Sequence, residues 1–120
     1  KLSIEKEEIS VVDNEILTPT STFAIAKQVE HLLSNNGVYG VYHLTAQGAC
    51  SWNRFAKKIF DLIKTSVRLN IAGPNEFPMK TPRPIYSVLE NKKLKEQELD
   101  IMPSWEECLR NYVEGKKLNV

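Results

Sequence analysis

Apolar residues recur with a helical period in two stretches of the first half of the chain. Between Thr22 and Ser34 they are spaced i, i+4, i+7 and i+8, which predicts an amphipathic helix followed by a left-handed cap at Gly37. A second stripe runs from an N-cap at Ser51 to about Lys64. The positions expected to be buried are Ile25, Val29, Leu32 and Leu33 in the first helix, and Trp52, Phe55, Ile59, Leu62 and Ile63 in the second.

The last third of the chain predicts two more helices. Ser104-Trp-Glu-Glu107 fits a capping box, so a helix is expected to begin there and to end at Gly115. Its predicted buried face is Trp105, Leu109, Tyr112 and Val113. A shorter helix is expected from an Asn91 cap to Glu98, with Leu94 facing inward.

Short β-branched or aromatic runs predict strands between these helices. They are Ile9–Asp13, Val38–Leu44 and Val67–Ala72, and turn residues follow each of them. Three main helices and a few short strands in mixed order indicate an α/β fold, a small mixed α+β module. At 120 residues the chain is expected to form a single domain, residues 1–120.

Composition excludes several classes of function. The formal net charge is +1, and 26% of the residues are charged, which argues against a nucleic-acid-binding face. Cys50 and Cys108 lack metal-ligand spacing and are too few for a disulfide scaffold, so a reduced, cytoplasmic setting is expected. No apolar run reaches the roughly 18 residues of a membrane span.

The motifs of an oxidoreductase are missing from this sequence. The glycines are scattered, so there is no Gly-rich phosphate loop, and no tyrosine has a lysine four residues later. His31 and His43 have no ligand-spaced partner, and we favour solvated or core histidines over metal ligands. We therefore assign no catalytic, cofactor-binding or metal-binding residue to the chain.

Two segments carry candidate binding chemistry. Phe77–Leu89 holds three of the six prolines, which should make the backbone around Arg83 stiff and extended. From composition alone we favour a plain connector for this stretch. Asp13 ends a predicted strand and begins the Thr18-Pro19-Thr20 loop, where a binding role and a local turn-capping role are about equally favoured.

Laid in order, five blocks resemble the C-terminal part of the dTDP-4-dehydrorhamnose reductases, in the extended short-chain dehydrogenase/reductase superfamily. The blocks span nearly the whole chain and have compatible spacing. Two residues depart from the family pattern, because Leu17 stands where glycine is usual and Ser21 where an aromatic residue is common. The blocks are Val11-Val-Asp-Asn14 with Thr18-Pro-Thr20, Val38-Tyr-Gly-Val-Tyr-His-Leu44, Cys50-Ser-Trp-Asn-Arg-Phe-Ala56, Glu76-Phe-Pro with Arg83-Pro-x-x-Ser-x-Leu89, and Pro103-x-Trp105 with Leu109.

The resemblance implies the substrate-binding part of a Rossmann-type enzyme that reduces dTDP-4-dehydro-L-rhamnose with NADPH or NADH. The dinucleotide-binding domain and the Tyr-x-x-x-Lys pair would lie in an N-terminal part that this chain lacks. The fragment alone would then bind no cofactor and would be inactive. Its partners would be a dTDP-sugar and the missing Rossmann domain, and a homodimer stays open.

On this resemblance, the Asp13–Thr20 loop and the Arg83 segment would form one wall of a cleft. Arg83 would bind the diphosphate, because a guanidinium offers forked, permanently charged donors. Thr18 and Thr20 would donate to sugar or phosphate oxygens, Pro19 would hold the loop's shape, and Lys80 would add a second cation at the rim.

Two other interpretations remain open from the sequence. One is a non-catalytic, reductase-like module for protein interaction or regulation. The other is an unrelated small α/β binding module, which would leave no wide apolar surface exposed. An exposed apolar patch larger than a few hundred Å² would argue against the latter.

Overall fold

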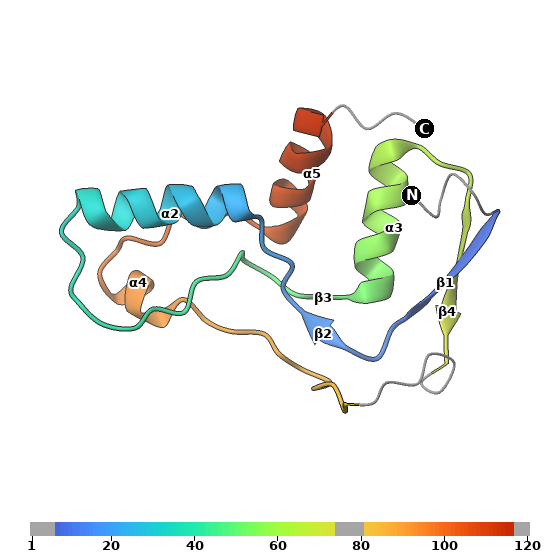
Figure 1. Ribbon diagram of the computed structural model, residues 1–120, viewed down its shortest axis with the longest axis horizontal. Helices are drawn as coiled ribbons and strands as arrows, with labels where there is room; N and C mark the ends of the chain where they lie inside the picture. The colour runs from blue at the N-terminus through green and yellow to red at the C-terminus, as the bar shows by residue number, and fades with distance from the viewer. Residues whose placement is uncertain (1–6, 74–80, 117–120) are drawn as a thin grey trace.

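The computed structural model describes residues 7–73 and 81–116 of the 120-residue chain. It confirms the mixed α/β class, with two helices longer than ten residues in the first half and one at the end. The elements are β1 (Glu8–Val12), β2 (Ile16–Leu17), α2 (Thr22–Ser34), β3 (Cys50–Ser51), α3 (Trp52–Ile63), β4 (Arg68–Ala72), α4 (Lys92–Glu96) and α5 (Trp105–Lys116). Figure 1 shows α2 and α4 at one end, β1 and β4 at the other, and α3 and α5 between them.

A two-stranded parallel sheet forms one end of the molecule. β1 pairs with β4 from Glu8 opposite Arg68 to Val12 opposite Ala72, and α3 lies between the two strands in sequence and packs against both. Asn53, in the first turn of α3, fixes this arrangement. Its Nδ2 donates to the carbonyl oxygens of Val11 and Asn70, each at 3.0 Å. One side chain therefore joins the start of a helix to both strands.

The apolar core lies where α5 and α3 meet the start of α2. Phe55 of α3 packs edge-on against Trp105 of α5, with ring centroids 6.1 Å apart. The buried members of this cluster are Ala24, Ala46, Cys50, Met102, Trp105, Cys108, Leu109 and Val113. α5 is central to this core because its buried face contributes four of these residues. The first turn of α5 is capped by Ser104 as predicted, since the Glu107 amide donates to Ser104 Oγ at 3.1 Å.

The fully buried amide of Gln28 joins α2 to the segment before α5. Its Nε2 donates to the carbonyl of Leu99 at 2.9 Å, and its Oε1 accepts the amide of Ile101 at 2.8 Å. The buried residues of α2 are Ala24 and Gln28. Of the four positions that the sequence pattern predicts as buried, Ile25 and Leu32 are half-buried, whereas Val29 and Leu33 are exposed. The predicted buried face of α2 is therefore correct only in part.

The predicted strand Val38–Leu44 is not formed. The backbone of Val38 and Tyr39 instead binds the side chains of Gln97, just after α4, and Lys93, within it. Among residues 7–73 and 81–116 no segment pairs with residues 38–44. His43 accordingly lies in a loop and not in a strand. Residues that favour β-structure form a strand only when a second segment provides the hydrogen-bonding partners for their backbone.

Several helix ends also differ from the prediction. Asn36, not Gly37, takes the left-handed conformation after α2, with φ 53°. Tyr112 is 55% exposed, so it does not belong to the buried face of α5, and α5 runs one residue past Gly115. Asn91 is the N-cap residue of α4 as predicted, but its side chain makes no capping hydrogen bond, and α4 ends at Glu96 rather than Glu98.

Replacing Gln28 by leucine should lower the free energy of unfolding by about 2–3 kcal/mol, because the Leu99 carbonyl and the Ile101 amide would lose their partner in a buried place. Urea unfolding followed by circular dichroism measures this. Glu30→Leu, on the exposed side of the same helix, is the control and should change stability by less than about 0.5 kcal/mol. Equal effects of the two variants would contradict the prediction.

Candidate functional site

The structure brings together the two segments that carry the candidate binding residues. The Ile16 amide donates to the carbonyl of Ile85, and the Ser87 amide donates to the carbonyl of Ile16, both at 2.9 Å. These bonds form a parallel bridge between Ile16 and Tyr86. On its other edge β2 pairs antiparallel with β3. β2 is therefore the middle of three segments that lie far apart in sequence (Figure 1).

Arg83 lies three residues before Tyr86, between Pro82 and Pro84, and its side chain is exposed. In the described part of the chain its guanidinium has neither a hydrogen-bond acceptor nor a carboxylate partner. The two prolines restrict the backbone on either side of this exposed cation, and the residues that follow it are bonded to Ile16 of the Asp13–Thr20 loop. Lys80, the second predicted cation, lies outside the described residues.

The hydroxyl groups of the Thr18-Pro19-Thr20 loop bind groups within the chain. Thr18 Oγ1 donates to the carbonyl of Gly48 at 2.7 Å. Thr20 Oγ1 donates to the carbonyl of Thr18 at 3.1 Å and accepts the amide of Ala46 at 3.1 Å. Each threonine has one proton to give, so the predicted donation to a ligand differs from what the geometry provides. Both hydroxyls instead fix the loop's shape.

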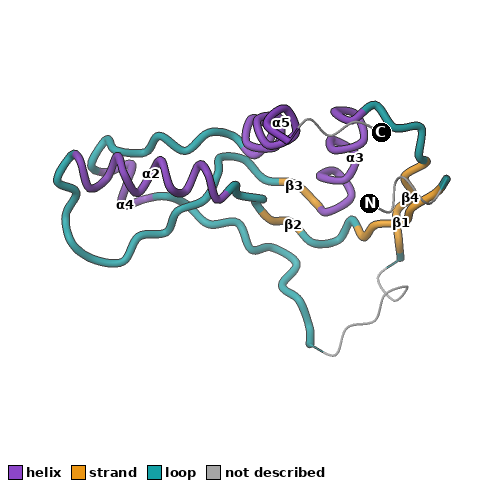
Figure 2. The backbone as a smooth tube through the Cα atoms, turned by 45° about the horizontal axis from the view of Figure 1, so that its top comes forward, coloured by secondary structure: helices purple, strands orange, loops and turns teal. Residues whose placement is uncertain are grey.

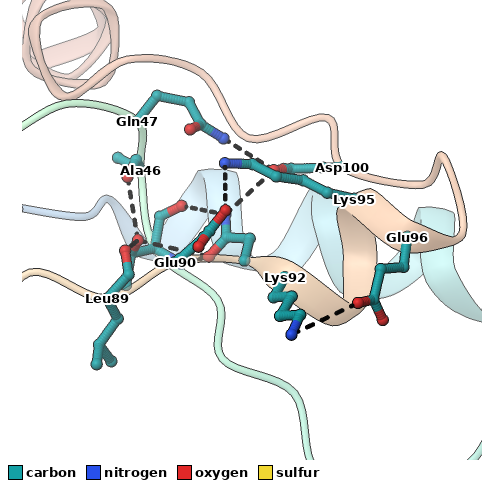
Figure 3. Close-up of polar contacts among 10 residues, drawn as sticks. Ala46, Gln47, Leu89, Glu90, Lys92, Lys95, Glu96 and Asp100 are labelled. Atoms are coloured by element: carbon teal, nitrogen blue, oxygen red, sulfur yellow. Dashed lines mark hydrogen bonds and ion pairs between the residues drawn. The ribbon is translucent and has the colours of Figure 1, made fainter.

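The 45–48 segment to which this loop binds is itself fixed by buried polar groups. Asn91, which is 2% exposed, accepts the Thr45 amide at 2.8 Å and donates to the Thr45 carbonyl at 2.7 Å. Gln47 Nε2 donates to Asp100 Oδ2 at 2.9 Å (Figure 3). The Asn91 amide therefore positions Thr45 as a neighbouring strand would. The sequence pattern assigned Asn91 to a helix cap and gave no sign of this role.

Backbone bonds on both sides of Gln47 attach the same segment to the start of α5. The Gln47 amide donates to the Pro103 carbonyl at 2.9 Å, and the Trp105 amide donates to the Gln47 carbonyl at 3.0 Å. Gly48 follows with φ 86°, and a Cβ there would lie 3.2 Å from Trp105 Cδ1. Glycine is required at this position both for the left-handed backbone and for the close approach of the indole.

Asp13 supports the start of α3 rather than a turn of its own. Ser51 Oγ donates to Asp13 Oδ1. Ser51 Oγ also accepts a hydrogen bond from the Arg54 amide at 3.1 Å, as the N-cap of α3. Glu15 accepts the indole N–H of Trp52 at 3.0 Å. Asp13 is exposed, so its second carboxylate oxygen remains available to solvent or a ligand. Sequence reasoning missed these cross-chain pairs, because their members are 37 and 38 residues apart.

The two residues that depart from the family pattern have clear structural places. Leu17 belongs to β2 and pairs with Cys50 of β3. Ser21 is the N-cap of α2, and its Oγ accepts the Ala24 amide at 3.1 Å. Leu17 thus takes part in the β2–β3 pairing before the Thr18–Thr20 loop, and Ser21 caps the helix after it.

Cys50 lies next to this site but belongs to the core. Burial is the main reason that the pKa of its thiol rises from 9.0 to about 11. The pKa of Cys108 is raised for the same reason. Protonated, buried thiols are poor nucleophiles, which agrees with a structural role.

Two other kinds of site are absent from the described residues. Across residues 7–73 and 81–116, no three His, Cys, Asp or Glu side chains gather closely enough to bind a metal ion. Within the same ranges, every helix is too short or too polar to cross a bilayer.

The described residues thus form a small mixed α/β module, in which β2 joins the loop after β1 to the residues before α3 and to the segment that follows Arg83. Residues 1–117 match the family model described as RmlD substrate binding domain, so the chain belongs to that family.

Solved structures of the same fold extend this assignment. A dTDP-4-dehydrorhamnose reductase from Clostridium acetobutylicum superposes with a TM-score of 0.90 at 36% identity, over 98% of this chain and 41% of that one. The dTDP-4-dehydrorhamnose reductase of Bacillus anthracis, solved in complex with NADP, superposes with a TM-score of 0.85 at 38% identity. The match covers 94% of this chain and 40% of that one.

A relative found by sequence comparison is a polysaccharide biosynthesis protein. The spore coat polysaccharide biosynthesis protein SpsK of Bacillus subtilis is 36% identical over 117 residues, which is 97% of this chain and 40% of that protein. The chain thus spans about two-fifths of the length of the relatives it matches.

Replacing Thr20 by valine should destabilise the chain by about 1–3 kcal/mol, because the Ala46 amide and the Thr18 carbonyl both lose their partner. Thermal or urea unfolding measures the loss. Thr22→Val, an exposed change at the first position of α2, serves as the matched control and should cost less than about 0.5 kcal/mol. The prediction fails if the two variants are equally stable.

The raised pKa of Cys50 predicts a loss of stability at high pH. Between pH 9 and about 11 the thiol ionises in the unfolded chain but stays protonated in the folded one, so the free energy of unfolding should fall across that interval. Below pH 9 the contribution should be constant. Urea titrations at pH 8 and 10.5 test this against Cys50→Ala, which should show a smaller drop. An identical drop in both proteins would rule out the assigned cause.

Proposed function

We propose that this chain is the sugar-nucleotide-binding part of a dTDP-4-dehydrorhamnose reductase. The enzyme would reduce dTDP-4-dehydro-L-rhamnose to dTDP-L-rhamnose for polysaccharide biosynthesis in the cytoplasm. Residues 1–120 would form its single substrate-binding domain. A separate dinucleotide-binding domain would supply NADPH or NADH and the proton-transfer residues, so this part would not react alone.

The observation that carries the proposal is the bridge between Ile16 and Tyr86. Its hydrogen bonds attach the backbone shortly after Arg83 to Ile16 of the Asp13–Thr20 loop, and the Arg83 side chain is exposed, which supports a binding role for it. A dTDP-sugar carries a diphosphate, for which a positioned guanidinium is well suited. The match to relatives named as dTDP-4-dehydrorhamnose reductases, over nearly the whole chain, supports the choice of ligand.

Within the proposed site the residues divide by task. Arg83 would bind the diphosphate, with Lys80 adding positive charge at the rim. Thr18, Pro19 and Thr20 would give the loop its shape, and the threonine oxygens would accept hydrogen bonds from sugar hydroxyls. Asp13 would accept a hydrogen bond from the ligand with the carboxylate oxygen that Ser51 does not use.

The direct test is Arg83→Ala in a reductase that carries residues 1–120 as its substrate-binding part. Loss of a charge-assisted contact should raise the KM for the sugar nucleotide tenfold or more, about 1.4 kcal/mol, with little change in the KM for NADPH. Steady-state kinetics with each substrate varied in turn separates the two effects.

Arg110→Ala, which removes an exposed arginine from α5, is the matched control, and its KM values should stay at wild-type levels. Arg83→Lys keeps the charge but not the forked donors and should fall between wild type and alanine. If the KM of Arg83→Ala stays within twofold, a change of about 0.4 kcal/mol, Arg83 does not bind the diphosphate.

A further inference from the structure

One asparagine of this chain is followed by glycine. Asn36 precedes Gly37, whereas every other asparagine precedes a residue with a side chain. Such a side chain shields the backbone nitrogen next to the asparagine, and glycine leaves that nitrogen open to react with the asparagine amide. Asn36 is exposed, at an end of α2 that lies away from α3 and α5 in both views (Figures 1 and 2).

Asn36 and Gly37 form the cap that ends α2. Asn35 is the C-cap residue, and Asn36 follows it in the left-handed conformation, with φ 53°. The Gly37 amide donates to the carbonyl of Leu32 at 3.0 Å, which is a hydrogen bond of the Schellman motif. Asparagine therefore occupies the position that glycine usually takes in this motif, and its backbone is strained there.

The side-chain amide of Asn36 differs from those of Asn35 and Asn53 in having no hydrogen-bond partner. Asn35 Nδ2 donates to the carbonyl of His31 at 2.8 Å. Asn53 Nδ2 donates to two backbone carbonyls, each at 3.0 Å. Within the described ranges, 7–73 and 81–116, no group bonds the Asn36 side chain. The amide that has to leave during deamidation is therefore free at Asn36 and held at the other two asparagines.

We propose that Asn36 is a site of spontaneous deamidation whose rate is set by the hydrogen bond between Gly37 and Leu32. The Gly37 nitrogen loses its proton to hydroxide and attacks Cγ of Asn36. The N–Cγ bond forms, the Cγ–Nδ2 bond breaks, and the leaving nitrogen takes a proton from water to become ammonia, which restores the hydroxide. Water then opens the cyclic succinimide at Cγ to give aspartate, or at the backbone carbonyl to give isoaspartate.

The attacking nitrogen is bonded in the folded chain, so the end of α2 has to open before it reacts. The Gly37 proton lies in the hydrogen bond to the Leu32 carbonyl. Hydrogen exchange at the Gly37 amide requires the same opening and the same loss of the proton to hydroxide. Helix ends fray at a lower free-energy cost than helix interiors, so this opening does not require the chain to unfold. Deamidation at Asn36 and exchange at Gly37 should therefore accelerate together as the pH rises.

Either product weakens the end of the helix. Both products replace a neutral amide by a carboxylate at the C-terminus of α2, where the helix dipole disfavours negative charge. Isoaspartate also adds a carbon atom to the backbone before Gly37, which takes the Gly37 amide out of register with the Leu32 carbonyl. The cap that slows the reaction is thus lost once the reaction has occurred.

Peptide mapping after incubation of the 120-residue chain at mildly alkaline pH tests the site. Trypsin cleaves after Lys27 and Arg54 and leaves Asn35, Asn36 and Asn53 in one peptide, so mass spectrometry compares all three in the same sample. Asn36 should convert about tenfold faster than either of the others, because only its following nitrogen is unshielded. A sample digested without incubation corrects for conversion during the digest. Equal conversion of the three asparagines overturns the proposal.

Two further comparisons test the role of the cap. In urea that unfolds the chain, Asn36 should convert about tenfold faster than in the folded chain, because the Gly37 nitrogen is no longer bonded. Asn36→Gly suits the left-handed backbone, so this variant should fold normally and lose the rapid conversion in the tryptic peptide. Equal rates at Asn36 in the folded and the unfolded chain overturn the control by the Gly37–Leu32 bond.

The variant Asn36→Asp reproduces one product and tests its effect on the helix end. The Gly37 amide should be less protected from hydrogen exchange in this variant, because a carboxylate at the C-terminus of α2 weakens the last turn. The Cys108 amide, which is bonded to the Ser104 carbonyl in α5, is the internal reference. Unchanged protection of Gly37 contradicts the effect assigned to the product.

Discussion

The pairing of Ile16 with two other segments is the constraint on which the candidate site depends. A two-residue strand would be negligible alone, yet it is bonded to Cys50–Ser51 on one edge and to residues 85–87 on the other. Through these bonds the loop after β1, the residues that lead into α3 and the segment after Arg83 lie side by side. Without Ile16 in place, Arg83 would have no fixed relation to the loop beside it.

Buried amides, rather than apolar contacts alone, set the positions of the loops around that wall. Gln28 and Asn91 are almost completely buried, and each binds both a backbone donor and a backbone acceptor. A side-chain amide can thus replace a missing neighbouring strand at a single residue. Such contacts are directional, so they fix geometry more sharply than a small core does. The ion pairs around α4 are exposed and contribute little by comparison (Figure 3).

Local signals were enough to predict α2, α3 and the start of α5, because periodicity and the serine caps are both encoded within a few residues. The joining of the two candidate segments was predicted only through family resemblance. The pairs Asp13–Ser51 and Asn91–Thr45 were missed because their members are distant in sequence. Thr18 and Thr20 were expected to donate to a ligand, and only the fold reveals that Gly48 and Thr18 carbonyls take those protons.

The two errors at α2 and residues 38–44 have one physical origin. A hydrophobic pattern predicts which side chains are buried, but it does not predict the surface that buries them. Val29, Leu33 and Val41 follow core-like patterns, yet in this chain they face solvent. Local periodicity therefore predicts which positions are apolar without fixing the surface against which each of them packs.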